Sequence, residues 1–452
     1  MGTVRIGNGA GFWGDSPEGP YQLMQLGRLD YLTADYLAEV ALSVLTKQHQ
    51  KNPKLGYAYD FIEVLERIAP LWAEQPRLRI CTNAGGVNPR ECARAAAEVM
   101  RANGLAGRKI ALVLGDDLMP HLDQWLAGGF EFQHMETGEP LGDKRAQLVS
   151  ANAYIGVESI IEALQAGADL VLAGRVTDPA MILGPAMFHH GWTPDDRDQL
   201  AGATVAGHLI ECGAQVTGGI STDWLSIPDP AGIGYPIVEI EEDGSAVVTK
   251  PPGTGGRVTE RTVKEQLLYE IADPRNFLTP DVIVDFTTLK VERIGPDRVR
   301  VSGAKGREPT ANYKVSAAIL DGCMASGELT IFGEDALKKA RRAGQSVLER
   351  LERAGVLFES TRVECLSSGE TIPGLGGQSA EATEVGLRVT VRDHDPSKVR
   401  RFTRELASLI TCGPPGTTGY AGGRPKVRDV LAFWPTLIPK EWIKTSIEII
   451  EV

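Results

Sequence analysis

The sequence predicts an α/β protein whose N-terminal part is an open parallel sheet with flanking helices, followed by an α+β region. In the first half, short apolar runs end in Gly, Asn or Asp clusters and precede helical patterns, at a spacing of roughly 30 residues. Six such units are recognisable, whereas a barrel of this type needs eight, so we favour the open sheet. After about Gly219, strand-like alternation replaces this regular order.

Six apolar runs are the expected strands of the parallel sheet, and helical patterns follow several of them. The strands are expected at residues 4–7, 29–32, 78–83, 109–115, 146–152 and 168–174. The helices are expected at residues 36–48, 59–73, 90–103, 157–166 and 179–188. Because parallel strands need crossover connections, this alternation predicts helices on the faces of the sheet.

The second half of the chain reads as an α+β region. Residues 236–250 alternate like a hairpin, with Asp243 and Gly244 at its turn. Residues 281–306 show the same alternation. The patterns then predict a helix with a solvated face over 335–354, and a strand, capped turn and helix over 386–410.

We expect two domains in the first 358 residues. A parallel α/β domain covers residues 1–220 and carries the Gly-rich strand-end loops, and an α+β region packed on it covers 221–358. Junctions are expected at the Gly-rich stretches 251–256 and 369–377.

Composition excludes several classes of protein. The 452 residues include 51 glycines, where a background of about 7% would give roughly 32, but they show no collagen-like period. A net charge of -12 repels phosphate backbones, so we expect no nucleic-acid partner. The six cysteines form no CxxC or zinc pattern, and no signal peptide or membrane-spanning run occurs. We therefore expect a cytoplasmic chain with reduced thiols and no membrane partner.

The first Gly-rich loop, Gly9–Gly14, matches the G-x-G-x-x-G pattern of dinucleotide-binding strands. The residues that follow, Asp15-Ser16-Pro17, do not continue a helix that would present amide groups to a pyrophosphate. We therefore expect neither NAD nor ATP, and we expect the loop to place Asp15 over a site as a catalytic carboxylate.

The loop after the third strand offers polar groups at the carboxyl edge of the sheet, where open α/β sheets bind ligands. Asn83, Gly85 and Gly86 are expected to bind substrate there. Asn88, which we also count among the substrate-binding candidates, has a structural alternative. With Pro89 and Glu91, it forms the pattern of a helix capping box.

Adjacent carboxylates follow the fourth strand. Asp116 and Asp117 either hold a divalent cation or divide into a catalytic acid and base, since like charges separate their pKa values. Structurally, one would cap a helix and the other would be solvated. Asn152, at the end of the fifth strand, is expected to orient the substrate.

Arg175 and Asp178 follow the sixth strand. A cation at a strand end beside a helix N-terminus suits a carboxylate or phosphate, so Arg175 is the expected anion anchor. Asp178 precedes Pro179 in the pattern of a helix N-cap, and it is also a candidate substrate contact.

A further segment places a carboxylate beside a thiol. Glu211 is a candidate catalytic residue, and Thr217 in the same segment is a candidate substrate contact. Cys212 would need a nearby base to act as a nucleophile, and His208 would share its helix face. A buried cysteine is more often structural. Near the C-terminus, 413–420 has no Gly-Lys-Ser/Thr, so it is no Walker A motif but an interface or covering loop.

Seven motifs in order resemble the acyclic terpene utilisation protein AtuA family over residues 3–360. They are GNGAGFWGDSP, LDYLTADYLAE, TNAGGVNP, LGDDL, SANAYIG, AGRVTDPA and ECGAQVTGG. The remainder, including GPPGTTGYAGGRP, resembles longer members that continue into a small ferredoxin-like α+β domain, here residues 359–452. The resemblance implies a role in the degradation of branched terpenoid acids through CoA thioesters.

The expected function is therefore that of a lyase or hydro-lyase acting on a branched acid or its CoA thioester, in a homo-oligomer. Such chemistry needs a carboxylate base, an anion-binding cation and polar groups that stabilise an enolate. Two alternatives are a non-catalytic binding or assembly subunit of an acyl-CoA carboxylase system, and a nucleotide-dependent enzyme that uses the Gly9–Gly14 loop.

Overall fold

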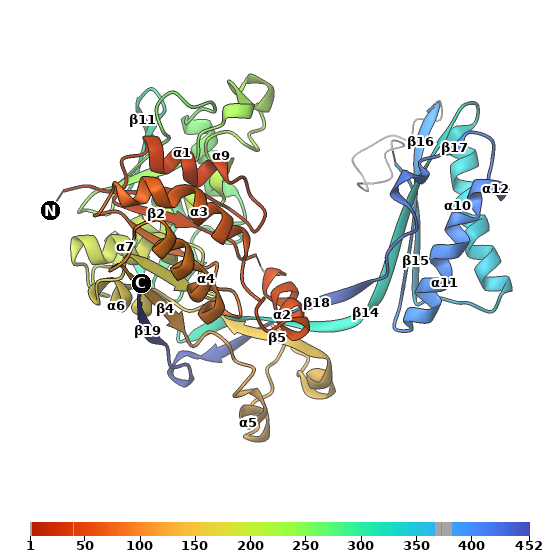
Figure 1. The fold of residues 1–452 in the computed structure, drawn as a ribbon, viewed down its shortest axis with the longest axis horizontal. Helices are drawn as coiled ribbons and strands as arrows, with labels where there is room; N and C mark the ends of the chain where they lie inside the picture. The colour runs from red at the N-terminus through yellow and green to blue at the C-terminus, as the bar shows by residue number, and fades with distance from the viewer. Residues whose placement is uncertain (1, 39, 367–371, 373–381) are drawn as a thin grey trace. The chain divides into compact units, whose positions relative to one another are not determined.

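A computed structural model describes residues 2–38, 40–366, 372 and 382–452. The described residues form two compact units, Met1–Ala318 with Phe433–Val452, and Ile319–Ala432 (Figure 1). The expected junction at 369–377 lies almost wholly outside the described residues.

The first unit is built on a mixed sheet whose centre is parallel. Among the described residues its order is β11-β12-β8-β7-β1-β2-β3-β6-β4-β19. The strands β1, β2, β3, β6 and β4 pair in parallel, and the strands outside them pair antiparallel. The parallel strands are β1 Val4–Asn8, β2 Tyr31–Ala34, β3 Arg79–Thr82, β4 Lys109–Leu114 and β6 Leu170–Ala173.

Antiparallel strands complete both edges of this sheet, and the unit also holds one small separate sheet. On the β1 side are β7 Ile237–Ile240, β8 Ala246–Thr249, β11 Lys290–Gly295 and β12 Arg298–Ser302, and beside β4 is β19 Ser446–Glu451. A separate sheet holds β9 Phe277–Leu278, β10 Ile283–Asp285 and β13 Lys305–Arg307.

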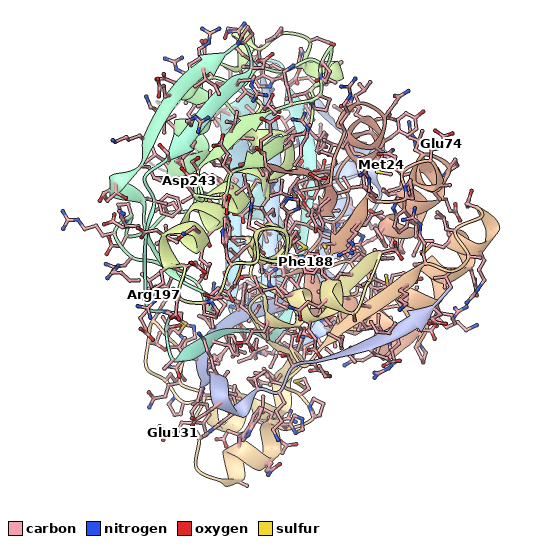
Figure 2. All side chains as sticks on the ribbon, turned by 90° about the vertical axis from the view of Figure 1, so that its left-hand side faces the viewer. Met24, Glu74, Glu131, Phe188, Arg197 and Asp243 are labelled. Atoms are coloured by element: carbon pink, nitrogen blue, oxygen red, sulfur yellow. The ribbon has the colours of Figure 1, made fainter. Side chains whose placement is uncertain are left out.

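Helices cover both faces of the sheet. Along the chain, the strands β1, β2, β3 and β4 are laid down in one direction across the sheet, and β6 is then inserted between β3 and β4. Because crossovers are right-handed, this change of direction places the helices before β4 and those after it on opposite faces. The contacts agree with two layers. One holds α1 Glu18–Leu26, α3 Asp60–Ala73 and α4 Pro89–Ala102, and the other holds α6 Glu158–Gln165, α7 Ala180–His190 and α8 Arg197–Ile210. Figure 2 labels Met24 of α1 and Phe188 of α7, one from each layer.

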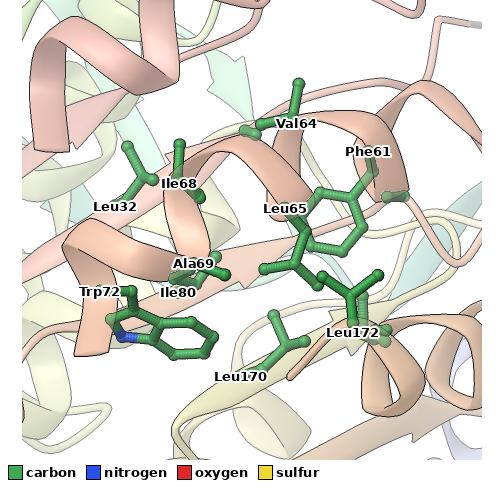
Figure 3. Packing of buried hydrophobic residues seen from close by; sticks show 14 of the residues in the cluster. Leu32, Phe61, Val64, Leu65, Ile68, Ala69, Trp72, Ile80, Leu170 and Leu172 are labelled. Carbon is green, nitrogen blue, oxygen red and sulfur yellow. The ribbon is translucent and has the colours of Figure 1, made fainter. Parts of the chain in front are cut away.

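The core beneath α3 shows why this helix forms where it does. Its buried positions recur at helical spacing from Phe61 through Leu65 and Ile68 to Trp72. Figure 3 shows these side chains facing residues of β3 and β6, Leu170 among them. Burial of each large apolar side chain contributes roughly 1.5–3 kcal/mol, so this cluster holds the helix layer on the sheet.

The sequence places most elements of the first half within a few residues, with one exception in pairing. The expected strand at 146–152 forms as β5 Leu148–Ala153, but it pairs with β14 Asn312–Phe332 and not with the parallel strands. The helix expected at 36–48 begins later, as α2 Ala41–Lys51. The other helices of this unit are the short α5 Leu122–Ala127 and α9 Glu260–Leu268.

The second unit is an antiparallel sheet packed against two helices. Its strands β15 Ser360–Leu366 and β16 Glu384–Asp393 lie beside β14, followed by β17 Thr417–Thr418. The helices α10 Ala336–Arg353 and α11 Pro396–Ala407 share one apolar core with this sheet. The short α12 Leu409–Cys412 follows α11, and β18 Arg428–Pro439 pairs with β14.

This division differs from the expected boundaries at 220 and 358. The strands β7, β8, β11 and β12 extend the sheet of the first unit, so the region after 220 does not form a body of its own. The helix α10 packs on β15 and β16, which places it in the second unit and not before a boundary at 358.

Candidate active site

A cavity of about 570 Å³ opens beside the carboxyl ends of β1 and β2 in the first unit. The loop after β1, the loop after β2 and the segment that follows α8 supply most of its walls. The side chains with chemical capacity in its lining are Asp15, Asp35, Asp178, Glu211, Cys212, Gln215, Tyr235, Tyr269 and Glu270. The cavity therefore lies at the sheet edge where doubly wound folds bind ligands.

The lining is rich in hydrogen-bond acceptors and negative charge. Five carboxyl groups line the cavity, and none of the described lining residues is Lys, Arg or His. Like charges this close oppose one another's ionisation, which favours the neutral acid at some of these positions. The walls therefore suit a ligand that donates hydrogen bonds or accepts a proton, and they disfavour a free carboxylate.

Glu211 and His208 form a buried acid–imidazole pair at the end of α8. The Nδ1 of His208 lies 3.0 Å from Oε1 of Glu211, and its Nε2 donates to the carbonyl oxygen of Gln266 at 2.9 Å. The latter contact fixes the Nε2 hydrogen, so Nδ1 and the carboxyl group share one further proton. Glu211 is 8% exposed and lines the cavity, and its Oε2 has no hydrogen-bond partner among the described residues.

The pKa values of this pair follow from burial and mutual attraction. Burial raises the pKa of Glu211, and Asp178 and Glu270 add to the rise, while His208 opposes it. Burial lowers the pKa of His208, but its contacts with Glu211 outweigh this effect and leave the pKa raised. Each group of the pair therefore binds its proton more tightly than it does in water.

Asn8 positions Glu211 from the end of β1. Its side-chain amide donates to the carbonyl oxygens of Ile210 and Glu211 at 2.7 and 2.9 Å, and its own oxygen accepts from Thr33. These bonds satisfy carbonyl groups left open at the helix end and tie that end to the sheet. No sequence pattern marks Asn8 as a functional residue, although it directly precedes the first Gly-rich loop.

Asp35 is a second buried carboxyl group in the cavity wall. Its Oδ1 accepts from the side chain of Asn83 at 2.6 Å and from the backbone of Leu37 at 3.1 Å. Burial raises the pKa of Asp35 well above its usual value, and Asp178 adds to the rise, whereas Arg175 and the bond from Asn83 oppose it. Burial therefore favours the protonated form of Asp35, which can donate a proton to a ligand.

Asp15 is held within its own loop. Its two oxygens accept from the backbone of Gly11 at 2.8 Å and of Ser16 at 2.7 Å, and Tyr235 donates to it at 2.5 Å. Gly11 is required there, because a Cβ atom would lie 2.6 Å from the backbone of Cys212. The loop amide thus binds its own carboxylate, and α1 begins only at Glu18, so the geometry differs from that of a dinucleotide loop.

Cys212 lines the cavity but is not activated as a nucleophile. Burial raises the pKa of its thiol, and the negative charges of Glu211 and Glu270 raise it further. His208 bonds to Glu211, so it does not serve as a base for the thiol. The thiol is therefore expected to be protonated at neutral pH.

Arg175 is buried and does not line the cavity. Its guanidinium bonds to the carbonyl oxygen of Leu37 and to Asp178, and it lies over the ring of Tyr154 at 4.2 Å. Arg175 is 1% exposed, bonds to Asp178 and opposes the rise in the pKa of Asp35. It therefore supports two carboxyl groups of the cavity wall. The expected N-cap bond from Asp178 is wrong, because α7 has no side-chain cap.

Asp116 joins three strand ends. Its Oδ2 accepts from Asn152 at 2.9 Å and from the backbone of Arg175 at 2.8 Å, and a Cβ atom on Gly174 would lie 2.7 Å from this carboxyl group. Burial raises its pKa to about 6. The exposed Asp117 accepts from the backbone of Met119 at 3.0 Å. The structure therefore shows these predicted residues and Asn152 in a packing network that does not line the cavity.

Four other predicted contacts have structural partners. Asn88 donates to the carbonyl oxygens of Pro53 and Leu55, and the expected capping box is wrong because α4 has no side-chain cap. Thr217 donates to backbone oxygens of its own loop and of Gly234. At Gly85 and Gly86, a Cβ atom would lie 2.7 Å from the carbonyl oxygens of Ala173 and Gly56, respectively, so close backbone packing explains both glycines.

The structure therefore brings together Asp15, Asp178 and Glu211 of the predicted set and adds residues that the sequence analysis missed. Asp35 has a visible signal, because it is the first acidic residue after β2. Glu270, Tyr235 and Tyr269 come from segments far along the chain and have no local pattern that marks them.

Within residues 2–38, 40–366, 372 and 382–452, no group of three or more His, Cys, Asp or Glu side chains has an arrangement that would hold a metal ion. The expected cation at Asp116 and Asp117 and the expected absence of NAD and ATP stay predictions. In the same residues, every helix is too short or too polar to cross a bilayer.

Comparison with known proteins gives one match. The model of a family described as acyclic terpene utilisation family protein AtuA matches residues 4–449. No curated protein and no solved structure matches the chain.

Proposed function

The chain belongs to the acyclic terpene utilisation AtuA family, and from this premise we propose that it is a hydro-lyase that moves a proton beside a thioester carbonyl group. The proposed substrate is the CoA thioester of a branched acid. The observation that carries the proposal is the buried His208–Glu211 pair: Glu211 lines the acidic cavity, and its Oε2 has no hydrogen-bond partner among the described residues.

Glu211 and Asp35 have environments suited to opposite roles. Glu211 is the base, because its bond to His208 opposes the rise that burial causes in its pKa, and its Oε2 has no competing partner among the described residues. Asp35 is the acid, because burial raises its pKa well above the usual value and so favours its protonated form. Two carboxyl groups whose surroundings separate their roles are a common acid–base arrangement.

The proposed step balances as an elimination of water. Glu211 takes the proton from the carbon next to the carbonyl, and the electrons of that C–H bond form the new double bond. The C–O bond at the next carbon breaks, and its oxygen leaves as water with the proton of Asp35. The reverse sequence adds water. Glu211 becomes neutral when it takes the proton and negative when it returns it, and its hydrogen bond to His208 stabilises the negative form.

The charge of the cavity favours a thioester over a free acid. A substrate carboxylate would meet the five carboxyl groups of the lining with no lining cation among the described residues. A thioester carbonyl is uncharged, and its oxygen can accept a hydrogen bond from a protonated carboxyl group. Arg175 supports this site from behind Asp178 and does not serve as its anion anchor.

We further propose that the second unit is a ferredoxin-like domain. The strands β15, β16 and β14 lie in that order, β18 pairs with β14, and α10 and α11 follow β14 and β16 in the chain. This is the strand order expected of a β-α-β-β-α-β unit.

The proposed reaction is tested by incorporation of solvent deuterium into 3-hydroxyoctanoyl-CoA, followed by NMR. The wild-type chain should exchange the hydrogen next to the carbonyl, and Glu211→Gln should slow the exchange by about 10²–10⁴-fold. Glu98→Gln, an exposed position on α4, is the matched control and should leave the rate unchanged. Thioester binding without any exchange in the wild-type chain would contradict the proposal and favour a non-catalytic binding role.

A further inference from the structure

A second cavity, of about 360 Å³, lies in the first unit beside the candidate active site. Most of its lining is apolar, and the larger apolar side chains are Met135, Tyr154, Phe277, Leu278 and Leu437. It therefore differs in chemistry from the acidic cavity, whose walls carry five carboxyl groups.

The two cavities share a wall. Asp178 lines both of them. The ring of His208 lies 5.7 Å from that of Phe277, which lines the apolar cavity, while its Nδ1 bonds to Glu211 of the acidic cavity. A ligand that reaches past Asp178 would therefore lie next to the acid–imidazole pair.

Exposed apolar side chains gather at this cavity. Met135, Leu278 and Leu437 are 50%, 60% and 42% exposed and come from three separate segments of the chain. Isolated exposed apolar residues are ordinary, but several around one hollow indicate a binding site for an apolar group. The acidic cavity does not suit such a group, because covering its carboxyl groups with hydrocarbon would remove them from water.

We propose that this cavity binds the apolar acyl chain of the substrate, with the thioester head across Asp178 in the acidic cavity. This inference rests on the proposed function. At roughly 30 Å³ for each water-sized group, the cavity holds a chain of roughly eight to twelve carbon atoms. Phe277, Leu278 and Leu437 would then set the preferred chain length and branching.

Calorimetric titration of the full chain with CoA thioesters of two to twelve carbons tests this site. Affinity should rise about threefold to fourfold for each methylene until the cavity is full, and free CoA should bind no better than acetyl-CoA. Leu278→Asp should weaken octanoyl-CoA binding at least tenfold and leave acetyl-CoA binding unchanged. The matched control is Leu225→Asp, at a 95% exposed leucine that does not line the cavity.

Three results would overturn the inference. Affinity that is independent of chain length would do so, as would equal effects of Leu278→Asp and Leu225→Asp. A change of oligomeric state in Leu278→Asp, seen by sedimentation, would assign the apolar residues to a contact between copies. Leu437→Glu provides a second variant if Leu278→Asp does not fold.

The deuterium experiment separates this inference from the proposed reaction. Chain-dependent binding without exchange would refute the reaction and retain the apolar site. Exchange with no dependence on chain length would refute the apolar site and retain the reaction.

Discussion

Asp35 and Asp116 occupy comparable places in the sheet but have different surroundings. Each follows a parallel strand at its carboxyl end, and in each case an asparagine donates to the carboxyl group. Burial raises the pKa of both. Asp35 lines the acidic cavity, whereas Asp116 faces the backbone of Arg175 and the strand end at Asn152. A position at a strand end therefore brings a carboxyl group to the functional edge, and the neighbouring loops decide whether it reaches a cavity.

The largest expected effect is at Arg175, whose backbone bonds to Asp116 and whose charge acts on Asp35. Arg175→Ala should lower the free energy of unfolding of the first unit by about 3–5 kcal/mol, because it empties a fully buried site and removes the donor to the carbonyl oxygen of Leu37 and to Asp178. The sequence-based expectation of an anion anchor implies instead that Arg175→Ala weakens ligand binding far more than stability. Urea unfolding followed by tryptophan fluorescence measures it, since all seven tryptophans lie in the first unit.

Arg145, which is partly exposed and paired with the exposed Asp123, provides the control for this measurement. Arg145→Ala should change the free energy of unfolding by no more than about 1 kcal/mol. A loss below about 1 kcal/mol for Arg175→Ala would show that the arginine does not hold the wall of the cavity.

The next effect separates Asp116 from its neighbour. Asp116→Ala should destabilise the first unit by about 1–3 kcal/mol, since it leaves the buried amide of Asn152 and the backbone of Arg175 without an acceptor. The exposed Asp117→Ala should cost about 1 kcal/mol or less. Thermal unfolding of both variants checks this order, and equal losses would contradict the packing role of Asp116.

The dependence of stability on pH tests the same carboxyl group. Its folded pKa of about 6 lies above its unfolded value, so the folded state binds this proton more tightly. Stability from this group is therefore fully present below about pH 4 and falls by roughly 1–3 kcal/mol as pH rises to about 6. Asp281, with its pKa also raised by burial to about 6, changes in the same direction.

A comparison of wild type with Asp116→Asn between pH 4 and 7 measures this contribution. The wild-type chain should lose more stability over this range than the variant does. An identical pH dependence in both would show that Asp116 keeps an ordinary pKa in the folded chain.

The smallest effect is expected at Cys212. Because burial and nearby carboxylates raise the pKa of its thiol, Cys212→Ala should change deuterium exchange by no more than about threefold. Thiol-reactive reagents should label Cys212 slowly at neutral pH. Rapid labelling together with loss of exchange in the variant would restore the nucleophile hypothesis.

The sequence predicts the elements of the first half well because their signals are local. The periodicity of α3 and the apolar run of β4 lie within single segments, and both elements form at their expected places. The pairing of β5 with β14 depends on residues more than 150 positions apart, so no local pattern indicates it. The boundaries of the two units fail to follow from sequence for the same reason.

The candidate site divides in a similar way. The sequence marks Glu211 as a candidate catalytic carboxylate. Its bond to His208 and the unpartnered state of its Oε2 depend on how the end of α8 packs against Asn8 and Gln266, which no local pattern indicates. Arg175 carries the charge that the sequence indicates, yet its burial against Leu37 and Tyr154 changes its role. Residue types are therefore predictable at the sheet edge, whereas their direction and burial are not.

The most direct test compares Asp35→Asn and Asp116→Asn as catalysts of water loss from 3-hydroxyoctanoyl-CoA. The rate of water loss, normalised to the amount of folded protein, is followed by the absorbance of the unsaturated thioester. Deuterium exchange is measured alongside and reports on the base alone. Asp35→Asn should lower the rate of water loss by at least about 100-fold, and Asp116→Asn should keep it within about threefold. A loss of activity in Asp116→Asn with retention in Asp35→Asn would contradict this prediction.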